Sequence, residues 1–308
     1  MRDKTTKCCL EEETMYIITT DTAADLPLSY IEEHHLLIAP LFYRIGETTY
    51  GSEGQIMPIR EFYSTMRSGA MPTTMGANPE DIKDMLRPHL ERGTDVLHIA
   101  FSSALSTSYQ SAVIAAQDLR EEFPNRTIYI VDSTCASLGQ GLLVHKALQH
   151  KDAGESIEQV HEWVEVNKSH ICHAFTVDDL FHLQRGGRIS KTTAIIGSLV
   201  KIKPVLHVND NGELISLQNV RGRKKALTTL VDMMVNDIAG YEDQNDIFFI
   251  SHGDCLDDAV FVAEQVKERT GIQNCIIDYV SATIASHSGP GTLALFYYGK
   301  SRSNSVPK

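Results

Sequence analysis

Residues 95–131, DVLHIAFSSALSTSYQSAVIAAQDLREEFPNRTIYIV, decide the fold class. The segment begins with an apolar run at Asp95–Phe101 and ends with another at Thr127–Val131, and both have the length of buried strands. The stretch Leu105–Glu122 between them has the pattern of a helix. A helix between two such strands is typical of a βαβ unit, so the segment predicts a parallel sheet.

The rest of the first half has the same alternation of short apolar runs and helical patterns. Two further strands are expected at Tyr16–Thr19 and Leu36–Ile45. Further helices are expected at Pro58–Met66, Pro79–Glu91 and Leu138–His150, the second with Asn78 as its N-cap. These elements predict an N-terminal, mostly parallel α/β domain with flanking helices, which we place at residues 15–168. Residues 1–14 precede it as an expected disordered extension.

The order of predicted strands and helices changes in the second half, after a predicted helix at Glu155–Lys168. Strands and helices are mixed here, and an Asn211-Gly212 pair indicates either a tight hairpin or a four-residue loop. The expected strands are His170–Val177, Pro204–Val208, Glu213–Val220, Asp246–Ser251, Asn274–Val280 and the apolar run Leu293–Tyr298. The expected helices are Asp178–Gln184, Lys224–Ile238 and Asp257–Thr270. The pattern predicts a C-terminal α+β domain at residues 169–308, with a cleft between the two domains.

Composition excludes several classes of function. The 308-residue chain has a formal net charge of −12, which disfavours nucleic acid and acidic membrane surfaces as partners. No apolar run approaches the ~20 residues that cross a bilayer, so no transmembrane segment is expected. The six cysteines show no disulfide spacing, and reduced thiols favour a cytoplasmic protein.

Polar residues follow three of the predicted strands. They are Asp21-Thr22, Ser102-Ser103 and Asp132-Ser133-Thr134. Ligands of parallel sheets sit at the carboxyl ends of the strands, beside helix N-termini. Each group taken singly is more often a helix cap than a ligand contact, but all three fall where a ligand is expected.

The segment SATIASHSGPG at residues 281–291 adds a histidine to this pattern. His287 precedes the Gly289-Pro290-Gly291 turn, whose glycines allow the backbone to approach a ligand closely. Together with the hydroxyls of Thr74, Ser102 and Ser103, this histidine could hold a carboxylate or phosphate without a lysine.

Other chemistries have weaker support. Ser103, His287 and Asp21 could form a nucleophilic trio, but the chain has no G-x-S-x-G elbow. The sequence His170-Ile171-Cys172-His173 has no accompanying C-x-x-C, so no metal site is predicted. Nucleotide-binding glycine motifs are absent. Two basic clusters are either solvated helix ends or a docking patch for an acidic partner or phosphate: Arg185, Arg188 and Lys191, and Arg221, Arg223, Lys224 and Lys225.

Seven segments together carry a resemblance to a known family. They are TTDTAADLP (19–27), PTT (72–74), SSALSTSYQSA (102–112), VDSTCASLGQGLLV (131–144), DDLFHLQRGGRIS (178–190), KIKPVLHVNDNGEL with NVRGRKKAL (201–227) and HSGPGTLALFYYG (287–299). In this order they resemble the DegV family of bacterial fatty-acid-binding proteins. Some members of that family are the acyl-carrying subunit of a fatty acid kinase.

The resemblance implies a non-enzymatic carrier that buries one long-chain fatty acid, with the acid's carboxylate at the domain interface. The carboxylate would be held by Thr74, by Ser102 or preferably Ser103 at the start of a helix, and by His287. Arg188 and Arg221 would contact phosphate or a separate ATP-dependent kinase. No cofactor or metal is implied. Met75, Gly76 and Ala77 depart from the family pattern beside the carboxylate.

Two other functions remain open at this stage. The first is an acyl hydrolase or transferase that uses Ser103 and His287. The second is a regulatory interaction protein with a permanently bound lipid. The length of the acyl chain does not follow from the sequence, because residues of an acyl tunnel look the same as core residues.

Overall fold

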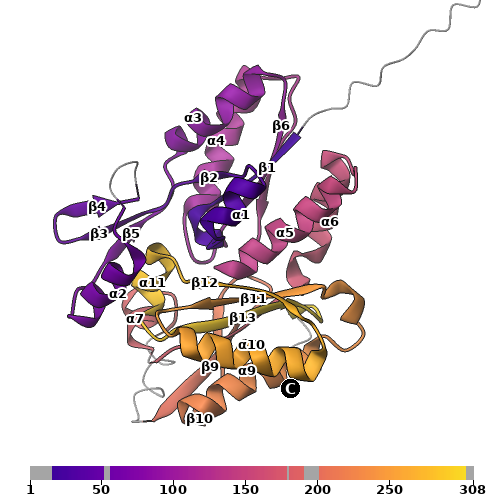
Figure 1. Ribbon diagram of the computed structural model, residues 1–308. Helices are drawn as coiled ribbons and strands as arrows, with labels where there is room; N and C mark the ends of the chain where they lie inside the picture. Colours follow the sequence, from indigo (N-terminus) through magenta and orange to yellow (C-terminus); the bar gives the residue numbers. More distant parts are fainter. Residues whose placement is uncertain (1–15, 52–55, 179, 191–200, 303–308) are drawn as a thin grey trace, which may run out of the picture.

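A computed structural model describes residues 16–51, 56–178, 180–190 and 201–302 (Figure 1). The expected N-terminal extension and Lys191 lie outside these residues. The described strands form sheets of four, six and three strands.

The four-stranded sheet is parallel throughout, as the sequence predicts. Its order is β2-β1-β6-β7. Pairs such as Ile18 with Leu97 and Leu97 with Tyr129 set its register. The strands are β1 (Tyr16–Asp21), β2 (Leu37–Ala39), β6 (Asp95–Ala100) and β7 (Ile128–Asp132). A short 3-10 helix, η1 (Thr22–Ala24), follows β1 directly.

Helices cover both faces of this sheet. On one face pack α3 (Pro79–Glu91) and α4 (Ser108–Glu122), through residues such as Leu86 and Ala115. On the other face pack α1 (Leu28–Glu33), α5 (Leu138–Asp152) and α6 (Ile157–Asn167). Asn78 caps α3, because its side chain accepts a hydrogen bond from the Glu80 N–H at 3.2 Å. This cap confirms the sequence prediction.

The predicted strand Leu36–Ile45 is wrong as one element. The chain leaves the parallel sheet after β2, and the next strand, β3 (Phe42–Ile45), belongs to a separate antiparallel sheet. Pro40 explains the break, because proline has no N–H to donate to a strand ladder. The small sheet also contains β4 (Thr48–Tyr50) and β5 (Thr73–Met75), and it packs with α2 (Ile59–Arg67).

The six-stranded sheet is mixed and confirms the expected α+β character of the second half. Its order is β10-β9-β8-β13-β11-β12, in which β11 and β12 are parallel and the other pairs are antiparallel. The strands are β8 (Ile171–Thr176), β9 (Ile202–Val208), β10 (Leu214–Arg221), β11 (Ile247–His252), β12 (Asn274–Tyr279) and β13 (Leu293–Tyr298). The hairpin predicted at Asn211-Gly212 joins β9 to β10 through residues 209–213.

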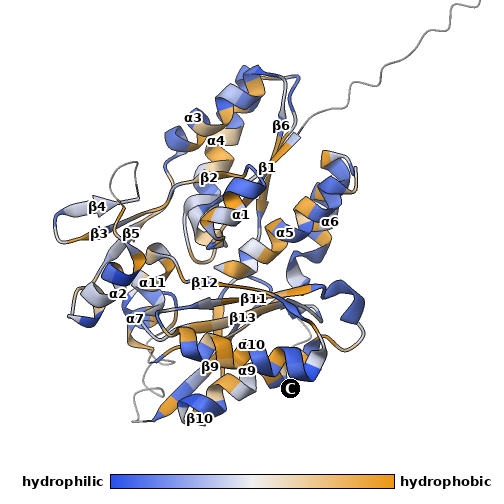
Figure 2. Ribbon diagram, viewed as in Figure 1, coloured by the Kyte–Doolittle hydropathy of each residue, from blue (hydrophilic) through white to orange (hydrophobic). Residues whose placement is uncertain are grey.

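Helices also cover both faces of the six-stranded sheet. Along β13, Leu293, Leu295 and Tyr297 face α9 (Arg223–Asp237) and α10 (Leu256–Thr270), and the alternate residues face α5. Figure 2 shows hydrophobic and hydrophilic residues alternating along α3 and α10, as expected for helices with one apolar side. The remaining described helices are η2 (Lys168–His170), α7 (Phe181–Arg185), η3 (Glu242–Gln244) and α11 (Ala282–Ser288).

Helix α5 lies between the two large sheets (Figure 1). It contacts β1 and β6 of the parallel sheet and β8, β11 and β13 of the mixed sheet. Its buried residues include Leu142 and Leu143, which have no exposed surface. The two sheets therefore share one continuous core around this helix.

Shortening a side chain of α5 is therefore expected to destabilise the whole fold. We predict that Leu142→Ala lowers the free energy of unfolding by about 2–5 kcal/mol, because it removes buried methyl groups and leaves a cavity. Val166→Ala in α6 is the control, since Val166 is 66% exposed and should change stability by less than about 0.5 kcal/mol. Urea denaturation measures both, and equal effects of the two variants would contradict a shared core.

Candidate functional site

A cavity of about 300 Å³ lies between the carboxyl end of the parallel sheet and the six-stranded sheet. Its walls come from both halves of the chain. The loop after β6 contributes Phe101 and Leu105, β5 contributes Thr74, and α11 and β13 contribute His287 and Phe296. The cavity is therefore at the position where a parallel sheet places its ligands.

Thr74 and His287 meet in the wall of this cavity. Oγ1 of Thr74 lies 2.7 Å from Nε2 of His287, within hydrogen-bonding distance, although the two residues are 213 positions apart in the sequence. Thr74 comes from the small antiparallel sheet and His287 from the last turn of α11. The structure thus brings together two of the residues that the sequence singled out.

The imidazole of His287 is held in its neutral form. Burial lowers its pKa to about 4, with further lowering by the positive charges of Arg188 and Arg185. Its Nδ1 is buried and has no hydrogen-bond partner among the described residues. The ring fits only because residue 186 is glycine, since a Cβ there would lie 2.1 Å from Nδ1.

Arg188 provides positive charge beside the histidine. It lines the cavity, and its Nε and Nη2 donate to the Leu105 carbonyl at 3.0 and 2.7 Å. Nη1 donates to the Gly186 carbonyl. In the described part of the chain, Arg188 forms no ion pair with a carboxylate, so no described carboxylate neutralises its charge. A guanidinium in this state attracts an anionic group in the cavity.

Arg185 links the two segments that carry Thr74 and His287. Its Nη2 donates to the carbonyls of Pro72, at 3.1 Å, and of Ser286, at 2.9 Å. Pro72 precedes β5, and Ser286 is the residue before His287. The arginine therefore fixes the distance between the strand that carries Thr74 and the helix that carries His287.

The rest of the cavity wall is largely apolar. Three aromatic rings, those of Phe101, Phe175 and Phe296, lie along it, with Val208 and Leu214 from the β9–β10 hairpin. The cavity thus combines a cationic and hydroxyl-bearing cluster with a largely apolar wall. This arrangement suits a ligand with an acid group on a hydrocarbon chain.

Ser102 and Ser103 lie outside the residues that line the cavity. Ser102 is buried, and its hydroxyl donates to the Gly212 carbonyl at 3.0 Å, which attaches the β9–β10 hairpin to the parallel sheet. Ser103 is exposed, and its N–H donates to Asp132 at 3.1 Å. The expectation that Ser103 begins a helix is wrong, since the chain passes through four further residues before α4 begins at Ser108.

Two hydroxyl residues of the same segment reach the cavity instead. They are Ser106 and Thr107, in the turn just before α4. Gly76 lies against this turn, because a Cβ at residue 76 would be 2.8 Å from Oγ1 of Thr107. The sequence signal was the hydroxyl-rich run at 102–108, but it did not show where the turn ends.

Gly289 and Gly291 also lie outside the cavity wall. Both have positive φ angles, 81° and 80°. A Cβ on Gly289 would meet the ring of His182, and one on Gly291 would meet the carboxylate of Asp178. The turn at Gly289–Gly291 therefore packs closely against His182 and Asp178.

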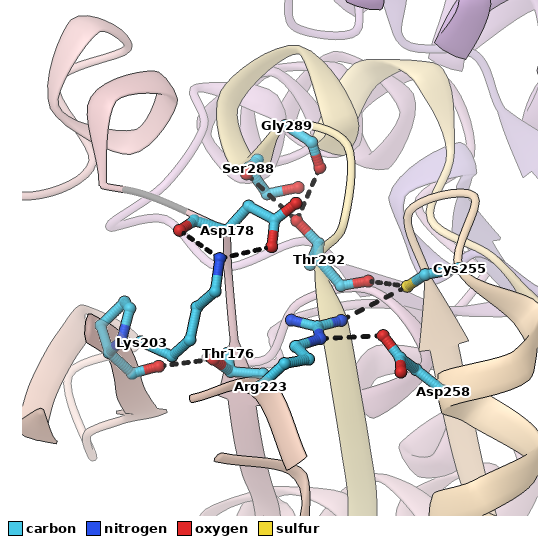
Figure 3. A network of polar contacts seen from close by, with 10 residues as sticks. Thr176, Asp178, Lys203, Arg223, Cys255, Asp258, Ser288, Gly289 and Thr292 are labelled. Carbon is cyan, nitrogen blue, oxygen red and sulfur yellow. Dashed lines mark hydrogen bonds and ion pairs between the residues drawn. The ribbon is translucent and has the colours of Figure 1, made fainter. Parts of the chain in front are cut away.

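Arg221 is exposed at the end of β10 and does not line the cavity. The nearby Arg223 belongs to the polar network of Figure 3. In that network Arg223 donates to Asp258 at 2.8 Å and to the sulfur of Cys255 at 3.5 Å, and Lys203 pairs with Asp178 at 2.7 Å. These bonds hold the start of α9 against α10 and the β13 end of the sheet.

His173 serves the structure and also contributes to the cavity wall. Its Nε2 accepts the Ala136 N–H at 3.1 Å, and Nδ1 lies 2.9 Å from the Ile171 carbonyl. Burial lowers its pKa well below the usual value, so the ring stays neutral. Over the residues that the structure covers, no group of three His, Cys, Asp or Glu side chains could hold a metal ion. In the same ranges no helix is long and apolar enough to cross a membrane.

Comparison with known proteins assigns the family. Residues 15–300 match the model of the family described as "Uncharacterised protein, DegV family". The chain belongs to the DegV family. A DegV domain-containing protein of Clostridium perfringens is 43% identical over 289 residues, which cover 93% of this chain and 98% of that protein.

Solved structures of DegV proteins share this fold. A fatty-acid-binding DegV protein from Thermus thermophilus has a TM-score of 0.81 and 30% identity, covering 92% of this chain and 99% of its own. A stearic acid-binding protein from Eubacterium ventriosum has a TM-score of 0.82 and 25% identity, covering 94% and 100%. The resemblance seen in the seven sequence segments is thereby confirmed, as is the α/β fold class.

The charge of Arg188 is expected to contribute, after burial, to the lowered pKa of His287. We predict that Arg188→Gln raises this pKa from about 4 towards the ordinary value of about 6.5, because it removes the largest charge effect and leaves burial in place. A pH titration of the histidine ring signals by NMR measures the shift. Arg221→Gln, outside the cavity, should leave the pKa unchanged. An unchanged pKa of His287 in the Arg188→Gln variant would contradict the placement of the Arg188 charge beside the imidazole.

Proposed function

We propose that this chain binds a single long-chain fatty acid in the cavity between its two halves. The acid's carboxylate lies at Thr74, His287 and Arg188, and its hydrocarbon chain lies along the apolar wall. The observation that carries the proposal is the cavity's lining, which combines the Arg188 guanidinium, with no ion pair among the described residues, and three phenylalanine rings. The fatty acids bound by related DegV proteins support it.

The free energy of such binding comes mostly from the hydrocarbon chain. Each buried methylene contributes about 0.8 kcal/mol, so a dozen contribute roughly 10 kcal/mol before the costs of association. A hydrogen bond from a neutral donor adds only about 0.5–1.5 kcal/mol. Thr74 and His287 therefore orient the acid, and the apolar wall retains it.

We further propose that the chain is a non-enzymatic carrier, which presents the carboxylate to a separate ATP-dependent kinase. The exposed Arg221, next to Lys224 and Lys225, supports a basic contact surface for that partner. The alternative enzyme would need Ser103 beside His287. The structure gives no hydrogen bond between them, since Nε2 of His287 faces Thr74 and Ser103 is on the surface.

Removal of the imidazole is expected to weaken retention of the acid. We predict that His287→Ala and Thr74→Val each lower the affinity for a C16 or C18 acid about three- to tenfold, because Thr74→Val removes the hydroxyl that donates to the carboxylate and His287→Ala removes the partner that orients this hydroxyl. Native mass spectrometry, followed by denaturation and solvent extraction, measures the bound acid and its chain length. His89→Ala, outside the cavity, is the control. A chain that neither contains nor takes up fatty acid would refute the proposal.

The kinase partnership has its own test. The loaded protein, a purified fatty acid kinase and ATP are expected to yield acyl phosphate only when all three are present. Arg221→Gln should slow this reaction severalfold and leave fatty acid retention unchanged, because Arg221 lies outside the cavity. Turnover of acyl esters or acyl phosphates by the isolated chain would contradict the carrier. A lipid that never exchanges would instead favour a permanently bound structural lipid.

A further inference from the structure

Arg302 is a buried cation near the C-terminal end of the described chain. Its surface is only 2% exposed. The family match ends at residue 300, so this arginine lies beyond the segment that the family model covers. Among the described residues, no carboxylate pairs with it. A buried charge of this kind costs free energy unless hydrogen bonds hold it, so its partners show what it does.

The partners of Arg302 are uncharged oxygens from two separate segments. Nη1 donates to the Thr134 carbonyl and Nη2 donates to the Thr134 hydroxyl, both at 2.7 Å. Nη2 also donates to the Lys168 carbonyl at 3.1 Å, and Nε donates to the Ser169 carbonyl at 3.4 Å. The guanidinium therefore joins the loop that follows β7 to η2, the short helix that follows α6.

Thr134 begins a segment that reaches the fatty acid cavity. Its φ is 50°, in the left-handed region that a β-branched residue rarely adopts. The two hydrogen bonds from Arg302 stabilise this conformation, together with the bond from the Thr134 hydroxyl to the Ser133 carbonyl at 2.7 Å. Two residues further on, Ala136 lines the cavity. The arginine thus fixes the backbone where the chain enters the cavity wall.

The same segment holds the ring of His173, which also lines the cavity. Nε2 of His173 accepts the Ala136 N–H at 3.1 Å, so Nδ1 carries the proton and donates to the Ile171 carbonyl at 2.9 Å. This pair of bonds requires a neutral ring, because a protonated Nε2 cannot accept. Burial lowers the pKa of His173 most, and the positive charge of Arg302 lowers it further. Arg302 therefore favours the form of the ring that bonds to Ala136.

The other titratable groups around His173 are uncharged. His207 lies on the neighbouring strand β9, and burial lowers its pKa. Burial raises the pKa of the Cys135 thiol to about 11 and raises that of Cys172 as well. Phe296 of β13 and Gly139 of α5, which pack against the ring, do not titrate. Of the groups that act on His173, Arg302 is thus the one with a permanent charge.

We propose that Arg302 is a positioning residue of the fatty acid cavity, which holds residues 134–136, and through Ala136 the ring of His173, in their places in the cavity wall. The inference rests on the proposed function, since its effect on a ligand requires an acid in this cavity. Stability alone does not call for an arginine here, because an apolar side chain would avoid the cost of removing a charge from water.

The dissociation rate of a bound C16 acid tests the effect on the ligand. We expect Arg302→Met to raise this rate about fivefold or more, because the wall segment loses the hydrogen bonds that hold it. Arg302→Lys keeps the charge but lacks the planar fork of donors, so its rate should lie between those of the parent and Arg302→Met. If Arg302→Met does not fold, the lysine variant decides, and a rate equal to that of the parent would overturn the proposal.

Arg126→Met is the matched control for this measurement. Arg126 also donates to a main-chain carbonyl, that of Gly93, but it does so at the amino end of the parallel sheet, away from the cavity. Its loss should leave the dissociation rate unchanged. An unchanged rate in Arg302→Met, or an equal increase in Arg126→Met, would overturn the proposal.

The titration of His173 gives a second readout, which needs no bound acid. NMR follows the histidine ring signals against pH, and His173→Gln identifies the signal of this ring. We expect His173 to titrate at a higher pH in Arg302→Met than in the parent, because removal of a nearby positive charge favours the charged imidazole. In Arg302→Lys it should titrate as in the parent. Equal titration in the parent and Arg302→Met, or an equal increase in both variants, would contradict the placement of the Arg302 charge beside His173.

The two readouts separate the possible failures. A parent protein that takes up no fatty acid would refute the proposed function, and the His173 titration would still test whether Arg302 acts on the ring. A parent that binds the acid, with the same dissociation rate as Arg302→Met, would leave the proposed function in place and refute the role of Arg302.

Discussion

The burial of α5 on two sides is the constraint on which the rest of the structure depends. A helix between two sheets must be apolar around most of its circumference, and α5 is buried along almost its whole length, from Leu138 to Leu148. Because both sheets pack on this one helix, their relative position is fixed by its side chains. The first cavity lies beyond its N-terminal end, next to Ala136.

Hydrogen bonds at the start of α5 hold this arrangement in place. Ser137, the N-cap of α5, has a φ of 56°, an unusual conformation for a residue with a side chain. Its hydroxyl contacts Asp25 of the parallel-sheet half and Ser251 of β11 in the other half. One strained residue therefore joins both halves and the central helix. Two further hydrogen bonds cross the same interface near the cavity. Ser102 donates to the Gly212 carbonyl, and Arg188 donates to the Leu105 carbonyl.

The interface between the halves contains two cavities with different walls. At the first, Arg185 and Arg188 lie near a neutral histidine, and most of the wall is apolar. At the second, of about 250 Å³, Asp25 and Asp278 lie near a tyrosine. Helix α11 borders both, since Ser281 precedes its first residue and His287 lies in its last turn.

The sequence by itself determined the fold class, the parallel first sheet, the α3 cap at Asn78 and the β9–β10 hairpin. It also selected Thr74, His287 and Arg188, which lie together at the cavity. These features follow from local patterns, such as the period of apolar residues, a capping side chain and an Asn-Gly turn. Only the tertiary structure decided that Ser106 and Thr107 reach the cavity while Ser102 and Ser103 do not. The length of the turn before α4 depends on its contacts with Gly76 and Arg188, which are distant in sequence. The break at Pro40 and the second cavity were likewise decided by packing between segments that no local pattern relates.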